Sequence, residues 1–129
     1  MIRADFGKSG PMSNPDVVIY HNPACGTSRN TLALLREKGL DPTVIEYLKA
    51  GWTRDQLQAL LARLELPARE ILRINGTRAD ELGLTDPAAS DEALIAAMIV
   101  DPILVNRPIV VTPKGAALCR PADLVLGLI

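Results

Sequence analysis

Residues 17–47 constrain the fold more than any other part of the chain. Residues 17–20 form an unbroken apolar run rich in β-branched side chains, which is typical of a strand covered on both faces. Thr27 or Ser28 can cap a helix that continues to residue 38, and residues 43–47 favour a second strand. A strand, a helix and a strand within about thirty residues require a right-handed crossover and parallel pairing.

The rest of the chain predicts a helical insert followed by a hairpin. A capping box at residues 53–56 begins the clearest helix, and shorter helical patterns follow at Pro67 and Ser90. The remaining expected elements are a strand at 108–112, a turn at 113–115, a strand at 116–119 and a helix that begins at Pro121. The order β-α-β, helical insert at about 53–100, β-β-α predicts an α/β protein with a mixed four-stranded sheet.

Composition narrows the functional classes. The 129 residues include 48% apolar residues, enough for a core in one domain at 17–129, whereas residues 1–16 read as a flexible leader. A net charge of -1 and four aromatic residues give no platform for nucleic acid, and no apolar run is long enough to span a membrane. Two cysteines and one histidine cannot form the usual four-ligand zinc site. We therefore expect a cytoplasmic protein without a metal, in which thiols stay reduced.

Cys25 is the candidate nucleophile. It stands in a polar loop between the first strand and the helix, beside unpaired backbone N–H groups that favour a thiolate. His21 and Arg29 can add positive charge there. The alternative is a small buried hydrophobe, which suits Cys119 better because Cys119 follows Ala117 and Leu118 within a predicted strand.

The spacing around Cys25 separates thiol mechanisms. A dithiol oxidoreductase needs a second cysteine three positions later, where this chain has Ser28. A cysteine phosphatase loop needs arginine six positions later, where this chain has Thr31. Any resolving thiol must therefore come from elsewhere.

Three arginines are candidates for binding an oxyanion. Arg107 and Arg120 fall at the ends of predicted strands, where loops gather, and a guanidinium fork matches a tetrahedral oxyanion. Each one by itself is weak evidence, because a lone arginine at the surface is usually solvated. Arg73 ends a short helical pattern and could instead interact with the helix dipole, and His21 could orient the thiol or only form a hydrogen bond at the strand end.

Three stretches resemble one family closely. They run from Tyr20 to Thr31, from Pro102 to Pro113 and from Leu118 to Pro121. In these stretches the chain resembles the glutaredoxin-coupled arsenate reductases of the thioredoxin-like superfold. The resemblance extends from about Val17 to the end, although residues 51–89 agree mainly in pattern.

The resemblance implies a role for each candidate residue. Cys25 would be the nucleophile, with His21 tuning it and Ser28 standing where a dithiol enzyme has its second cysteine. The resemblance also implies a cis peptide bond before Pro108. The oxyanion-binding residues it implies are Arg73, Arg107 and Arg120. Arsenate would be reduced to arsenite, for arsenic detoxification, with glutathione as co-substrate, glutaredoxin as partner and no bound cofactor.

Two other functions fit parts of the pattern. A monothiol glutaredoxin-like protein can hold glutathione or an iron–sulfur cluster at a cysteine-glycine-x-serine site, which residues 25–28 echo. A non-enzymatic redox regulator of the same superfold, one that docks on RNA polymerase, usually has a cysteine pair at the helix start. This chain has Ser28 at the second position of that pair, which argues against the regulator.

Overall fold

A computed structural model describes residues 16–129, so the expected leader at 1–16 lies almost wholly outside the described residues. The chain divides into two compact units. The sheet unit comprises residues 16–46 and 107–129 of the described chain, and the helical unit comprises residues 47–106. Each unit is described by itself.

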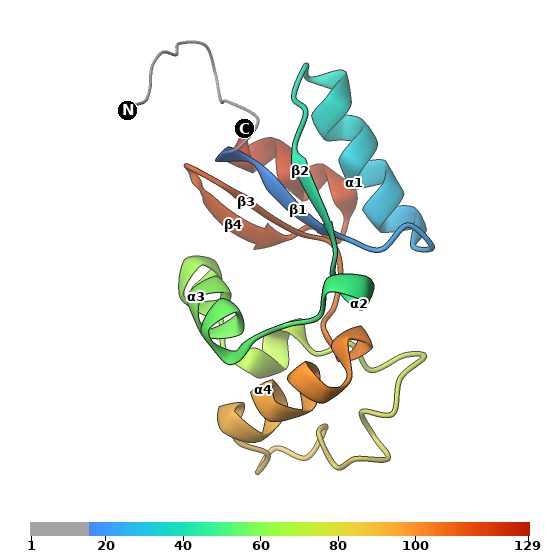
Figure 1. The fold of residues 1–129 in the computed structure, drawn as a ribbon, viewed down its shortest axis with the longest axis vertical. Helices are drawn as coiled ribbons and strands as arrows, with labels where there is room; N and C mark the ends of the chain where they lie inside the picture. The colour runs from blue at the N-terminus through green and yellow to red at the C-terminus, as the bar shows by residue number, and fades with distance from the viewer. Residues whose placement is uncertain (1–15) are drawn as a thin grey trace. The chain divides into compact units, whose positions relative to one another are not determined.

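The sheet unit contains the predicted mixed four-stranded sheet (Figure 1). Its strands are β1 (Val18–His21), β2 (Thr43–Glu46), β3 (Ile109–Thr112) and β4 (Gly115–Leu118), in the order β2-β1-β3-β4. β1 pairs with β2 in parallel, and the pairs β1–β3 and β3–β4 are antiparallel. The predicted crossover and the predicted hairpin are both confirmed.

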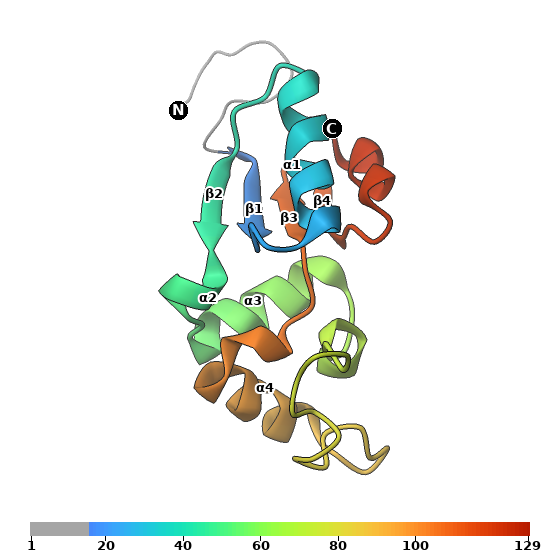
Figure 2. The same ribbon diagram turned by 90° about the vertical axis from the view of Figure 1, so that its right-hand side faces the viewer.

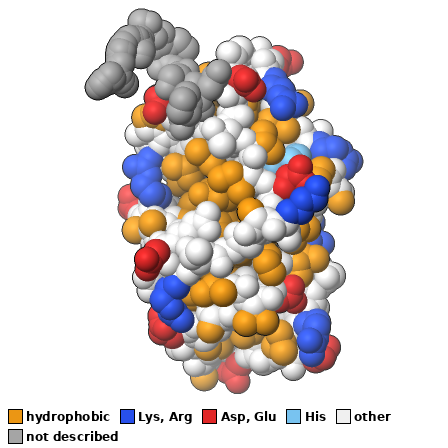
Figure 3. Space-filling model, in the orientation of Figure 1, with side chains coloured by type: hydrophobic (Ala, Val, Ile, Leu, Met, Phe, Trp, Pro, Cys, Tyr) orange, Lys and Arg blue, Asp and Glu red, His pale blue; other side chains and the backbone are white. Residues whose placement is uncertain are grey.

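Two helices cover one face of this sheet, α1 (Gly26–Glu37) and the 3₁₀ helix η4 (Ala122–Leu128) (Figures 1 and 2). Between them and the strands lies a core to which α1 contributes Leu32 and Leu35. The other buried residues of this core are Val17, Ile19, Leu40, Val110, Cys119 and Val125. The last helix was expected at Pro121, and it forms one residue later as a 3₁₀ helix. Figure 3 shows further hydrophobic side chains gathered over the strands.

The start of α1 differs from the prediction. The helix begins at Gly26, so Cys25 is its N-cap residue, with extended backbone angles of φ -96° and ψ 123°. Thr27 and Ser28, the predicted capping residues, both lie inside the first turn. No side chain caps this helix end. Its first N–H groups therefore remain directed toward residues 22–25, which we call the Cys25 loop.

The helical unit is built from five short helices. These are α2 (Tyr47–Ala50), α3 (Arg54–Leu64), the 3₁₀ helix η2 (Ala68–Ile71), α4 (Asp91–Val100) and the 3₁₀ helix η3 (Pro102–Leu104). The predicted capping box is confirmed, because Thr53 Oγ1 accepts from the Gln56 N–H at 3.1 Å and Gln56 Oε1 accepts from the Thr53 N–H at 3.3 Å. Ser90 caps α4 as expected. The predicted insert at about 53–100 falls within this unit.

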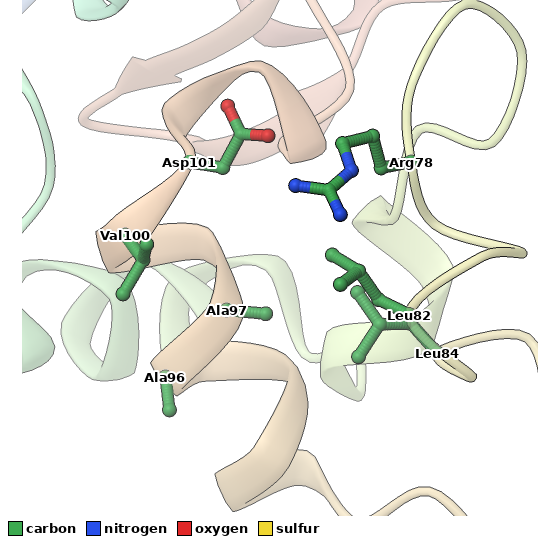
Figure 4. A pocket seen from close by; sticks show the side chains of 7 residues that line it. All are labelled: Arg78, Leu82, Leu84, Ala96, Ala97, Val100 and Asp101. Atoms are coloured by element: carbon green, nitrogen blue, oxygen red, sulfur yellow. The ribbon is translucent and has the colours of Figure 1, made fainter.

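A pocket of about 590 Å³ lies in the helical unit (Figure 4). Leu82, Leu84 and Val100 give it apolar walls, and Arg78 and Asp101 lie at its edge. None of the side chains that line it is a nucleophile, so it is not the site of thiol chemistry. Among the helices of residues 16–129, none is both long and apolar enough to cross a membrane.

Candidate active site

The Cys25 loop joins the end of β1 to the start of α1. The Cys25 N–H donates to Asn22 O at 3.0 Å, and Cys25 O accepts the Arg29 N–H at 3.0 Å as α1 begins. Cys25 is largely covered, with 8% of the residue's surface exposed. The fold thus places this thiol where the unpaired N–H groups of a helix end are nearest.

The surroundings of Cys25 lower the pKa of its thiol. Burial is the largest single influence, and by itself it raises the pKa. Two backbone N–H groups lower the pKa, Ser28 more than Thr27. Two guanidinium groups also lower the pKa, Arg107 through its charge and Arg120 through a hydrogen bond. The net effect lowers the pKa, so a larger fraction of Cys25 is thiolate than of an ordinary cysteine at the same pH.

The sheet topology brings the two arginines together. Tyr20 near the end of β1 pairs with Ile109 at the start of β3, and Ile109 pairs with Leu118 at the end of β4. Arg107 precedes β3 and Arg120 follows β4, so both lie at the sheet edge where the Cys25 loop begins. The peptide bonds from Arg107 to Pro108 and from Arg120 to Pro121 are cis.

Arg120 makes a direct contact with Cys25, the candidate nucleophile. Its Nη1 donates to Cys25 Sγ at 3.7 Å and to Arg107 O at 3.1 Å. The second bond fixes the guanidinium group beside the sulfur. A thiolate with a guanidinium donor on it and a second guanidinium charge nearby can accept an anion that would otherwise be repelled.

His21 and Ser28 form a buried pair behind the loop. His21 is 5% exposed and Ser28 is fully buried, and His21 Nδ1 lies 2.7 Å from Ser28 Oγ. The same oxygen accepts the Asn22 N–H at 3.1 Å. The side chain of Ser28 therefore ties the first turn of α1 to the end of β1, while its backbone N–H faces Cys25.

The pKa of His21 is lowered, mainly by burial; the charge of Glu46 opposes this shift, and the charges of Arg36 and Arg29 add to it. A lowered pKa keeps the imidazole neutral at neutral pH. The cations that act on Cys25 are therefore Arg107 and Arg120, and a neutral His21 does not add the positive charge that the sequence allowed.

Comparison with known proteins decides which family this site belongs to. The ArsC family model matches residues 20–128, which include the whole sheet edge described above. The chain belongs to the ArsC family. An arsenate reductase of Rhizobium meliloti (strain 1021) is 55% identical over 88% of this chain and 81% of its own length. An arsenate reductase of Escherichia coli (strain K12) is 51% identical over 92% of this chain and 82% of its own length.

Solved structures agree with this membership. The structure of an arsenate reductase from Vibrio cholerae matches with a TM-score of 0.85 and 43% identity, over 93% of this chain and 100% of that one. The predicted thioredoxin-like fold is thereby confirmed for this member of the ArsC family.

Two further residues named in the sequence analysis are Arg73 and Cys119. Arg73 follows η2 in the helical unit, where its Nε donates to Asn75 O at 3.0 Å. Its part in oxyanion binding stays a prediction. Cys119 is fully buried in the core of the sheet unit, and burial raises its pKa to about 12. Its thiol is therefore protonated and inert in this ArsC protein.

Metal binding has no support in the described chain. Within residues 16–129, no three histidine, cysteine or acidic side chains lie close enough together to hold a metal ion.

Sequence reasoning missed the part that Asn22 has in this site. Asn22 is 6% exposed, and its Oδ1 accepts the Ala24 N–H at 3.0 Å, while its carbonyl oxygen accepts the Cys25 N–H. Its own N–H donates to Ser28 Oγ. Asn22 is thus hydrogen-bonded to Ala24 and Cys25 of the loop and to Ser28 in the first turn of α1. The signal was an asparagine two residues before Ala24 at the end of a strand, which is typical of an Asx turn.

We expect Asn22→Ala to raise the pKa of the Cys25 thiol. Without its Oδ1 acceptor the loop no longer holds the Ser28 and Thr27 N–H groups toward the sulfur, and stability falls by about 1 kcal/mol. The pH dependence of iodoacetate labelling should move to higher pH, so that labelling at neutral pH is slower. Asn30→Ala, at an exposed position of α1, serves as the control. An unchanged profile in Asn22→Ala would contradict the assignment.

Proposed function

We propose that this chain is an arsenate reductase that converts arsenate to arsenite, in arsenic detoxification, through an arsenate bound to Cys25. The observation that carries the proposal is the contact of Arg120 with a thiol of lowered pKa, in a member of the ArsC family. The thiol of Cys25, the guanidinium group of Arg120 and the family membership all support the thiol-dependent reduction of arsenate.

The first step joins sulfur to arsenic. The Cys25 thiolate attacks arsenate, an S–As bond forms, an As–O bond breaks, and the oxygen leaves as water after taking up protons. Arg107 and Arg120 hold the oxyanion and offset the repulsion between thiolate and arsenate. Arg73 is the third proposed ligand of the oxyanion.

His21 and Ser28 act on the nucleophile through the loop. The Ser28 N–H supports the thiolate directly, and the contact of Ser28 Oγ with neutral His21 keeps that N–H in place. In this proposal His21 tunes the thiol by holding Ser28. It does not contribute a charge.

An external thiol completes the reduction. Position 28 is a serine, and Cys119 is buried with its pKa raised to about 12, so neither supplies a second reactive thiol. We propose glutathione for this part. Its thiolate attacks Cys25 Sγ, the S–S bond forms, the S–As bond breaks and its electron pair stays on arsenic, which is reduced by two electrons.

A glutaredoxin then clears the mixed disulfide. Its thiolate attacks the glutathione sulfur, and the Cys25 thiolate leaves and is ready for the next arsenate. This exchange requires an abundant supply of reduced thiols, and on that basis we propose a cytoplasmic location.

Arsenite formation tests the function directly. Arsenite should be produced from arsenate when glutathione and glutaredoxin are both present, and production should fall to background when glutathione is omitted. Arsenite formation that is independent of glutathione would contradict the proposed reductant. No arsenite under any of these conditions would contradict the activity itself.

A further inference from the structure

Arg29 lies on the solvent side of the Cys25 loop. It stands one turn after Cys25 on α1, and its Nη1 donates to Pro23 O at 2.9 Å. Its Nη2 is 3.7 Å from the point where a Cβ on Gly26 would lie. The guanidinium group therefore extends over the stretch from Pro23 to Gly26 while the residue remains exposed.

Most of the hydrogen-bonding capacity of Arg29 is directed to solvent. A guanidinium group has five N–H donors, and within residues 16–129 the acceptor of the Arg29 side chain is Pro23 O. The first turn of α1 holds no acidic residue, and the described chain forms no ion pair with Arg29. Its charge is thus available at the surface beside the nucleophile.

The arginines of the sheet unit fall into two groups by what they act on. Arg107 and Arg120 lower the pKa of the Cys25 thiol. Arg36 and Arg29 instead lower the pKa of His21, and Arg36 stands in the last turn of α1, away from the residues that follow Cys25. Arg107 and Arg120 thus account for the charges at the sulfur and at an anion bonded to it. Arg29 suits an anionic group that lies farther from the sulfur, on the outer side of the loop.

We propose that Arg29 binds a carboxylate of the small acidic thiol that reacts with Cys25. The inference rests on the proposed function, in which glutathione attacks Cys25 Sγ. The carboxylates of glutathione are several bonds away from its sulfur, so they extend past Cys25 when the two sulfurs meet. A guanidinium fork matches a carboxylate with two parallel hydrogen bonds, and Arg29 offers this fork at the loop surface.

Thiol–disulfide exchange without arsenate tests this subsite. The Cys25 thiolate of the full chain is mixed either with oxidised glutathione or with bis(2-hydroxyethyl) disulfide, which is neutral, and both rates of adduct formation are followed by mass spectrometry. Cys119 does not compete, because it is buried and protonated. The ratio of the two rates measures the preference for a carboxylate and cancels changes in the thiolate fraction.

Three variants separate charge from loop structure. Arg29→Gln keeps an N–H donor for Pro23 O but removes the charge, and Arg29→Lys keeps a charge. Arg36→Gln removes an exposed arginine from the last turn of the same helix and is the matched control. We expect the ratio to fall about two- to fivefold in Arg29→Gln, the range typical of one exposed ion pair. It should fall less in Arg29→Lys and stay unchanged in Arg36→Gln.

Each other result overturns the inference. If both rates fall together in Arg29→Gln, Arg29 only shapes the loop. If neither rate changes, the carboxylate does not bind there. The preference should also weaken as salt is added. Because the assay contains no arsenate, a chain that shows the preference but forms no arsenite contradicts the proposed function and leaves the subsite intact.

Discussion

Arsenite formation falls at least about 10³-fold in kcat/KM when Cys25 is replaced by serine, because the attacking atom itself is lost. A serine hydroxyl stays protonated at neutral pH, and His21 cannot easily activate it, since its Nδ1 is held by Ser28. The backbone N–H groups and the two arginines favour a thiolate that is already charged. They have no comparable effect on a neutral hydroxyl.

The matched control for this substitution is Cys119→Ala. It removes the other cysteine from the core and costs stability, by roughly 1 to 2 kcal/mol for a small buried group. Arsenite formation per folded molecule should stay within about twofold of the parent, because a buried thiol with a raised pKa takes no part in the reaction. Turnover that survives in Cys25→Ser, or disappears in Cys119→Ala, would exclude Cys25 as the single nucleophile.

The second large effect is expected at the arginine that contacts the sulfur. Arg120→Gln removes a charged donor from Cys25 Sγ and from the proposed oxyanion position. Loss of a charge-assisted hydrogen bond costs roughly 1.5 to 3 kcal/mol, which corresponds to a rise in the KM for arsenate of about 10- to 150-fold. The pKa of the thiol should rise as well, so iodoacetate labelling at neutral pH becomes slower.

Arg107 should be coupled to Arg120. Arg107→Gln removes a charge but keeps the carbonyl that anchors the Arg120 guanidinium, so its own effect should have the same direction. The double variant should lose less than the sum of the two single losses, because the two side chains serve one anion. Arg36→Gln, on the far turn of α1, should leave the KM unchanged. An unchanged KM for arsenate in Arg120→Gln would mean that the oxyanion binds elsewhere.

Local patterns in the sequence predicted most of the fold. The apolar run before the loop, the box at residues 53–56 and the turn between the last two strands each depend on near neighbours, and each formed as expected. The differences lie at the ends of elements. β4 begins at Gly115, which we predicted in the turn, and Cys119 follows this strand instead of lying within it. η4 is a 3₁₀ helix. α1 begins at Gly26, because the chain turns at residues 23 and 24 and Cys25 still has extended backbone angles. α2 and η3 are too short to show a helical period in the sequence.

The site was predictable in its residue types more than in its contacts. From the sequence, Ser28 is informative only because it is not a second cysteine. In the structure its hydroxyl is hydrogen-bonded to His21, seven residues earlier, and accepts the Asn22 N–H. The contact of Arg120 with Cys25 joins residues 95 positions apart. Such a contact depends on strand register and on how two loops meet at the sheet edge. Those properties come from the packing of the whole unit and leave no local pattern.

The burial of Cys119 has a consequence for how the protein withstands oxidants. A thiolate such as that of Cys25 is readily oxidised to a sulfenic acid, and many proteins protect this state by forming an internal disulfide. Here the thiol of Cys119 is enclosed in the core and protonated, so it cannot form a disulfide with the oxidised Cys25. A small thiol that reacts quickly with the sulfenic acid of Cys25 prevents further oxidation to the sulfinic acid, which is irreversible. How long each molecule stays active therefore depends on the concentration of small thiols around it.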